Sequence, residues 1–289
     1  MGIQLQIPNK KIISIPIAVY TNKIFKWQLS LFWFNHKLIY NEDAKNRALP
    51  IVIKRNYERE SKMDVFDWPV DAPVQLCDAY FDFFIGLDKE KYLPINIQTG
   101  LYQIIKNIND EQIIELLDCD MFHLKPAPYI EIEDNELHVC TVYENWHLFS
   151  LTKHSEVIEK YTCGKKDYYN GGFVPIIGKA KTFKKILLDW ILFHKNIADN
   201  SEKFAALSWW AGMYSLQAAC EINKIKMISK DFCYIPNVNE LNDNHYIAHY
   251  SCDPIFNKNK ILELDMSKFK DNIFYNRVKQ WLLNYDIRQ

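Results

Sequence analysis

The sequence contains few glycines and nothing that would divide the chain into separate units. Only 8 of its 289 residues are glycine. Repeats and low-complexity linkers are also missing, so the chain offers no clear boundary at which to cut it. We therefore expect a single domain over residues 1–289, a length that is sufficient to bury a sizeable core.

Cysteine patterns and a strong charge of one sign are missing too. The seven cysteines include no Cys-x-x-Cys pair, and their odd number and irregular spacing favour neither a disulfide framework nor a zinc site. The formal net charge of -1 argues against a strongly cationic coat for nucleic acid, although it does not exclude a local basic groove.

Segments that direct a chain to a membrane are not found either. No stretch approaches 18 uninterrupted apolar residues, so no membrane span is expected. The mixed polar residues from Met1 to Lys11 do not resemble a signal peptide. Together with the cysteine pattern, these features favour a cytoplasmic protein in a reducing compartment.

What the chain does contain is Asp118-Cys119-Asp120, which ends the apolar run from Ile113 to Leu117. Such a run predicts a buried strand with two carboxylates at its C-terminal edge, where open α/β sheets bind ligands. Carboxylates this close raise each other's pKa, and a divalent cation relieves their repulsion. A nucleotide diphosphate would then complete the oxygen shell of the metal. This arrangement is typical of metal-dependent glycosyltransferases; the alternative is a turn with two solvated acids.

Strands and helices alternate along the rest of the chain. Apolar runs predict strands at 12–20, 50–54, 113–117, 173–178 and 227–229, and helical periodicity predicts helices at 23–40, 99–107, 182–197, 201–223 and near the C-terminus. Two alternating segments, 129–132 and 137–143, flank Asp134-Asn135 and predict a hairpin. Pro16, inside the first strand, argues for a sheet edge or a bulge there. The order of elements predicts an α/β fold with a mainly parallel central sheet.

From Asp118 to about residue 257 the order of motifs resembles one family. It comprises the hydroxyproline O-arabinosyltransferases and the related peptidyl-serine galactosyltransferases, which have a GT-A-type fold. The motifs that carry this resemblance are Asp118-Cys119-Asp120-Met121-Phe122-His123-Leu124-Lys125-Pro126, Ile176-Ile177-Gly178-Lys179-Ala180, Trp209-Trp210-Ala211-Gly212-Met213-Tyr214, Lys230-Asp231-Phe232 and His249-Tyr250-Ser251-Cys252-Asp253. The match covers roughly half of the chain. It implies a GT-A-like (Rossmann-like) domain, with a nucleotide-binding half over about 1–117 and a metal, donor-sugar and acceptor half over about 118–289.

The resemblance also implies a UDP-sugar donor, a divalent cation such as Mn2+ or Mg2+, and retention of configuration at the anomeric carbon. One departure concerns Gly212, because the family usually has Glu before Met-Tyr. A looser resemblance, in size, soluble character and residue usage, links the chain to phage enzymes that glycosylate 5-hydroxymethylcytosine in DNA, some of them with arabinose. It implies that base as the acceptor and the cytosol of a bacterium or an infected host as the location; a hydroxyl on a protein or a glycan is the alternative.

The resemblance to the arabinosyltransferases and galactosyltransferases implies three metal ligands, Asp118, Asp120 and His249. Asp120 is the more direct carboxylate ligand, and Asp118 is directed toward the ribose or the metal. His245, four residues before His249, is the competing histidine. The catalytic candidates are Asp231 and Asp253, because retaining transfer needs a group that stabilises an oxocarbenium-like carbon. Glycosidases use a carboxylate for this, and an amide or the leaving phosphate itself is the alternative in a transferase. A helix cap or turn cap is the plainer interpretation of both acids.

Other residues are candidates for contact with the donor or the acceptor, and each has a plainer interpretation as a turn, a solvated loop or core. Glycines allow a backbone to approach a sugar closely, lysines can meet a diphosphate by charge, and aromatic rings can stack on sugars or bases. The donor candidates are Thr21, Asn22, Asn170, Gly171, Gly172, Lys258 and Lys260, with Trp209 and Trp210 as stacking candidates. The densest basic cluster, which could follow a phosphate backbone, is Lys54, Arg55, Arg59 and Lys62.

The sequence therefore predicts a metal-dependent, retaining glycosyltransferase that moves a sugar, expected to be arabinose, from UDP to a hydroxyl. A hypothesis of a different class is a non-catalytic relative that only binds sugar or nucleic acid. Gly212 keeps this second hypothesis open, whereas the retained acids and His249 argue against it.

Overall fold

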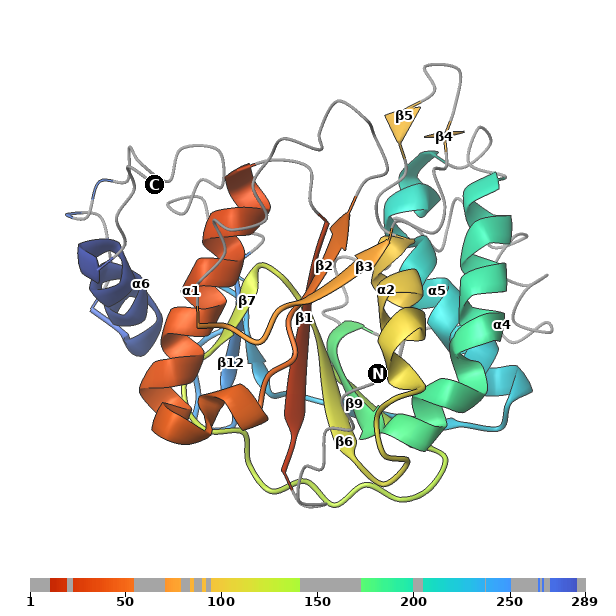
Figure 1. Ribbon diagram of the computed structural model, residues 1–289, viewed down its shortest axis with the longest axis horizontal. Coiled ribbons are helices and arrows are strands. Elements are labelled where there is room, and N and C mark those ends of the chain that lie inside the picture. Colours follow the sequence, from red (N-terminus) through yellow and green to blue (C-terminus); the bar gives the residue numbers. More distant parts are fainter. Residues whose placement is uncertain are drawn as a thin grey trace.

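The computed structural model describes residues 11–19, 23–54, 71–78, 84–85, 90–91, 95–140, 173–199, 205–236, 238–250, 265, 267 and 271–284. A seven-stranded sheet runs through the middle of the molecule (Figure 1). Its strands, in spatial order, are β10 (Lys226–Lys230), β8 (Glu136–Cys140), β9 (Phe173–Lys179), β6 (Ile113–Asp118), β1 (Ile13–Val19), β2 (Ile51–Lys54) and β3 (Gln75–Asp78). Only β9 runs antiparallel to its neighbours in this sheet. The predicted α/β fold with a mainly parallel sheet is thus confirmed.

Helices cover both faces of this sheet (Figure 1). One face packs against α2 (Asn96–Ile105), α4 (Ala180–Asp199) and α5 (Ala205–Ile222), and the other against α1 (Lys23–Tyr40), which continues into the 3-10 helix η1 (Asn41–Asn46). The predicted stripe on α4 is buried from Phe183 to Ile191, as expected for a helix with apolar residues on one side. A final helix, α6 (Ile273–Asn284), packs against α1 through Trp281.

Two small sheets complete the described fold. One consists of β11 (Cys233–Tyr234), β12 (Ile247–His249) and β7 (Met121–His123), and the other of β4 (Phe84–Ile85) and β5 (Glu90–Lys91). In the first, β12 is antiparallel to β7 and parallel to β11. Because β7 follows β6 after a turn of two residues, this small sheet begins at the C-terminal edge of the central sheet.

The expectation that Pro16 marks a sheet edge or a bulge is wrong, because β1 lies inside the sheet with regular pairing to β6. The Ser14 N–H donates to the Arg47 carbonyl, and the Ser14 carbonyl accepts from the Leu49 N–H. The backbone groups of alternate residues in a strand point to the same neighbouring segment, so the backbone nitrogen of Pro16 also points toward the side of Arg47 and Leu49. The β2 ladder begins only at Ile51, so the missing N–H of Pro16 falls against the irregular segment that precedes it.

The predicted hairpin between 129–132 and 137–143 is wrong as well. Residues 129–132 form no strand, and Tyr129 is 78% exposed. Both edges of β8 are already occupied, by β9 on one side and β10 on the other. The turn at Asp134-Asn135 does form, with Asn135 at a φ of 61°. Within the described residues, no helix is long and apolar enough to cross a membrane.

Candidate metal centre

The first part of the candidate site is the end of β6. This strand lies between β1 and β9, and the side chains of Ile114, Leu116 and Leu117 are fully buried, as expected for a strand covered on both faces. Asp118 is the last residue of the strand, and a turn over Cys119 and Asp120 leads into β7. Asp118 is half-buried and Asp120 is 7% exposed. The sequence prediction of two carboxylates at the end of a buried strand is confirmed.

His249 comes to these carboxylates through strand pairing. It is the last residue of β12 and stands opposite Met121 of β7. The Tyr250 N–H donates to the Asp120 carbonyl at 3.2 Å, which continues this pairing beyond the strands. As a result, the His249 Nε2 lies 3.2 Å from the Asp120 Oδ1.

The three side chains present donor atoms that suit one divalent cation. One ligand atom each from Asp118, Asp120 and His249 can be chosen so that all lie within 4.8 Å of one another. Atoms bound to a common cation at about 2.0–2.6 Å lie at most roughly 5 Å apart, so this separation is compatible with shared coordination. Carboxylates are common ligands of Mg2+ and Mn2+, and an imidazole is a common ligand of transition metals. Among the described residues, no other group of three such side chains meets this criterion.

The competing histidine, His245, is occupied elsewhere. Its Nδ1 accepts the Asn242 N–H at 3.1 Å, and its Nε2 lies 3.0 Å from the Asp231 Oδ1. Both ring nitrogens are therefore engaged in the loop that precedes β12. Of the two histidines, only His249 faces the carboxylates.

Asp231 is exposed and lies outside the group of three ligand candidates, and its catalytic role stays a prediction. It lies two residues before Cys233, the first residue of β11, which belongs to the same small sheet as β12. Burial raises the pKa of the Cys233 thiol well above its usual value, and Cys140, Asp231 and Asp120 raise it further. The thiol is therefore neutral at pH 7.

Most of the other predicted site residues lie outside the described residues. These are Thr21, Asn22, Asn170, Gly171, Gly172, Asp253, Lys258, Lys260 and the basic residues Arg55, Arg59 and Lys62. The backbone of Lys54 ends β2, and the backbones of Trp209 and Trp210 belong to α5, but their side chains are likewise outside the described part.

Gly212, the departure from the family pattern, lies at a close contact between helices. A Cβ at this position would stand 3.2 Å from the Gln98 Nε2 and 3.4 Å from the His194 Cε1. The His194 Nδ1 in turn bonds the Gln98 Oε1 at 3.1 Å, and the Trp190 Nε1 donates to the Gly212 carbonyl at 2.8 Å. A side chain at this position of α5 would therefore require Gln98 of α2 or His194 of α4 to shift slightly.

Sequence reasoning missed a buried polar network beside the site. Glu115, inside the apolar run of β6, contacts Ser14, His123 and Tyr246, and all four side chains are at most 2% exposed. Burial would raise the pKa of Glu115, but the charge and hydrogen bond of His123, with the bonds from Tyr246 and Ser14, lower it overall. The signal in the sequence was an acid within a strand otherwise built of Ile and Leu.

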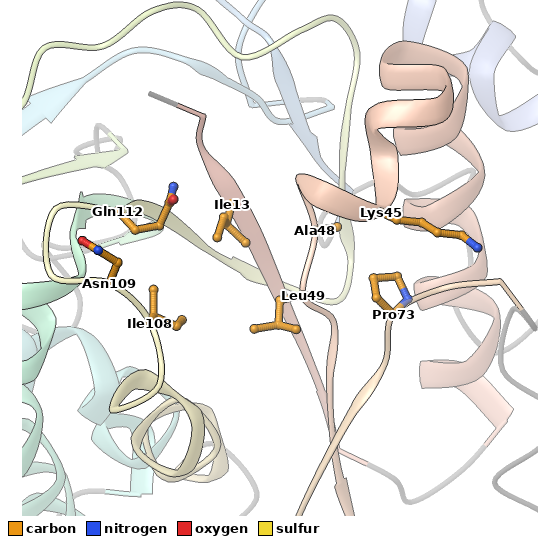
Figure 2. A pocket seen from close by; sticks show the side chains of 8 residues that line it. All are labelled: Ile13, Lys45, Ala48, Leu49, Pro73, Ile108, Asn109 and Gln112. Carbon is orange, nitrogen blue, oxygen red and sulfur yellow. The ribbon is translucent and has the colours of Figure 1, made fainter. Parts of the chain in front are cut away.

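An apolar hollow lies at the opposite edge of the sheet (Figure 2). It is lined by Ile13, Lys45, Ala48, Leu49, Pro73, Ile108, Asn109 and Gln112. Ile13 begins β1 and Gln112 precedes β6, so the hollow lies at the N-terminal ends of these strands. The metal-ligand candidates lie at the C-terminal end of β6, and the hollow is no part of their site.

Comparison with known proteins adds a structural likeness and no sequence relative. No protein-family model matches the chain, and no curated protein matches it either. A galactosyltransferase, LgtC, solved with donor and acceptor sugar analogues, is 11% identical with a TM-score of 0.45 over 95% of this chain and 96% of that one. An active-site mutant of LgtC is 12% identical with a TM-score of 0.46 over 94% and 95%. Likeness at this level carries no weight for function, which must be argued from the site itself.

Proposed function

We propose that the protein is a divalent-cation-dependent, retaining glycosyltransferase that moves a sugar from a UDP-sugar to a hydroxyl. The single observation that carries the proposal is the cluster of Asp118, Asp120 and His249 at the C-terminal end of a central strand. A sheet edge of this kind is where α/β folds bind their ligands. Two carboxylates and an imidazole would bind a cation that a diphosphate can share.

In this proposal, Asp120 and His249 hold Mn2+ or Mg2+, with Asp118 on the metal or on the ribose of the donor. The bound cation would act as a Lewis acid that stabilises negative charge on the departing UDP. Burial of Asp120 and His249 limits competition from water for their ligand atoms. Thr21, Asn22, Asn170, Gly171, Gly172 and Lys258 are proposed to contact the donor.

We assign the stabilisation of the anomeric carbon to Asp231 or Asp253. Asp231 is held by its neighbours: Oδ1 accepts from the His245 Nε2 at 3.0 Å, and Oδ2 accepts from the Asn242 Nδ2 at 3.4 Å. The carboxylate is thus oriented while it stays open to solvent. A group that must meet a sugar needs both properties.

For the sugar and the acceptor we propose arabinose and 5-hydroxymethylcytosine in DNA, with a hydroxyl on a protein or a glycan as the alternative. A DNA enzyme must reach its base in the major groove or flip it out of the stack. It should also bind DNA with a steep dependence on salt, because released counterions favour the complex. A protein-modifying enzyme should not show this dependence.

The test is UDP release from a panel of UDP-sugars with Mn2+, with and without hydroxymethylated DNA, on the wild type and on Asp120→Ala. Metal-dependent release that requires the DNA and is lost in Asp120→Ala supports the donor class and the acceptor. Release that is indifferent to DNA supports the transferase and moves the acceptor to proteins or glycans. A lack of release with every donor and acceptor would contradict the proposal and favour a binding protein.

A further inference from the structure

The buried carboxylate of Glu115 joins several of the segments that carry the candidate metal ligands. The Glu115 Oε1 accepts the Tyr246 hydroxyl at 2.7 Å, and its Oε2 accepts the Ser14 hydroxyl at 2.8 Å. The His123 Nε2 lies 2.9 Å from the same Oε2. Glu115, His123 and Tyr246 have no exposed surface. Hydrogen bonds to an ionised acceptor are short and strong, so this carboxylate joins its partners firmly.

Three members of this network stand at the same distance along the chain from the three metal-ligand candidates. Glu115 precedes the first aspartate by three residues in β6, His123 follows the second aspartate by three, and Tyr246 precedes the ligand histidine by three. In a strand, three residues span roughly 10 Å. The buried carboxylate of Glu115 thus connects the three segments that carry the ligands, at a position three residues away from the ligand on each segment.

The register of β7 against β12 decides where His249 lies. The paired stretch is short: Ile247 stands opposite His123, and His249 stands opposite Met121. A slip of one residue would turn every side chain of β12 to the other face and move His249 away from Asp120. Because His123 of β7 and Tyr246, the residue before β12, bond the same carboxylate, a slip would break at least one of these bonds.

We propose that Glu115 is a positioning residue for the cation. It fixes the register of β7 against β12, and the position of both on β6, so that the three ligands meet at one point. The inference rests on the proposed function for its claim that the three ligands bind a cation. The positioning of the strands by Glu115 applies to the protein without a cation as well.

The discriminating variant is Tyr246→Phe, which removes one hydroxyl from the network and keeps the ring. Its matched control is Ile186→Val, a small deletion in α4 within the core on the other face of the sheet, where Ile186 is fully buried. Two quantities are measured on both: the Mn2+ dissociation constant, by the electron paramagnetic resonance of free Mn2+, and the hydrogen exchange rate of the Tyr250 amide without metal. The Tyr250 amide is informative because its bond to the Asp120 carbonyl lies at the metal end of the paired strands.

We expect Tyr246→Phe to weaken Mn2+ binding about 10-fold, the lower end of the range for residues that orient metal ligands. The Tyr250 amide should exchange faster than the loss of global stability explains, and Ile186→Val should change neither quantity beyond that loss. If Tyr246→Phe and Ile186→Val behave alike in both measurements, Glu115 only stabilises the fold and the inference is overturned. If the wild type binds no Mn2+ while the Tyr250 amide of Tyr246→Phe still exchanges faster, the proposed function fails and the positioning role stands.

Discussion

Replacing Glu115 by Gln should destabilise the protein strongly at neutral pH. The carboxylate accepts from three side chains, and Gln offers a single acceptor oxygen in the same volume. The amide nitrogen of Gln would face a side chain that donates a hydrogen bond to Glu115 in the wild type. At least one buried donor therefore loses its acceptor, whichever way the amide turns.

The magnitude follows from the loss of charge-assisted bonds in a fully buried site. A hydrogen bond to a charged group contributes about 1.5–3 kcal/mol, and breaking a buried ion pair costs about 3–5 kcal/mol. We expect Glu115→Gln to lower the free energy of unfolding by about 2–4 kcal/mol, within that span. For a chain of 289 residues the loss corresponds to a decrease in Tm of roughly 3–7 °C.

The pH dependence provides the sharper test. The folded state lowers the pKa of Glu115, so its stabilisation is fully present above the unfolded value of about 4.3 and is lost as the pH falls through the folded value. Thermal unfolding of wild type and Glu115→Gln should therefore differ most at pH 7, and the difference should shrink only as the pH falls below about 4.3 and through the lower pKa of the folded state. The control is Glu111→Gln, the same change at an exposed acid that pairs with Lys179 and Lys181, which should have little effect. Equal Tm values at pH 7, or a difference that does not vary with pH, would refute the reasoning.

Three further predictions concern packing and buried histidine. Gly178→Ala would place a Cβ against the Leu137 side chain of the neighbouring strand β8, so the urea midpoint should fall by an amount equal to about 1–3 kcal/mol; an unchanged midpoint would contradict this close contact between β9 and β8. Trp281→Ala, at a side chain 1% exposed, should cost about 3–5 kcal/mol, whereas Leu283→Ala, at 79% exposure, should not shift the midpoint. Burial lowers the pKa of His194 to about 3, so the unfolded state takes up a proton first as the pH falls below about 6.5, and stability is lost at up to about 1.4 kcal/mol per pH unit. In urea titrations at several pH values, His194→Asn should show a shallower loss between pH 6.5 and 4, and an identical slope would argue against a neutral buried histidine.

Local patterns in the sequence were sufficient to predict the elements that position the site. The apolar run before Asp118 identified β6, because a strand buried on both faces is apolar throughout. Helical periodicity located α1 and α4 for a similar reason, since one face of each helix packs on the sheet. These predictions depend on what a segment buries and not on which neighbour it meets.

Partners distant in sequence were beyond such patterns. Residues 129–132 alternate like a strand, yet β8 pairs with β9 and β10, which are distant in the chain. The choice between His245 and His249 as a ligand depends on the pairing of β12 with β7, which places His249 opposite Met121 and leaves His245 in the loop before the strand. Glu115 was overlooked because its three partners come from β1, β7 and the segment before β12, and only the folded chain brings them together.

The most direct test of the central claim is a Mn2+ titration of the wild type, Asp120→Asn and Asp231→Asn, followed by the electron paramagnetic resonance of free Mn2+ with and without UDP. Asp120→Asn removes the charge of a proposed ligand, and Asp231→Asn is the same change at an acid outside the cluster. The account predicts one saturable site in the wild type, tighter binding with UDP, retention of binding in Asp231→Asn and a loss of at least about 10-fold in Asp120→Asn. Absence of saturable binding in the wild type, or equal binding by Asp120→Asn, would contradict the account.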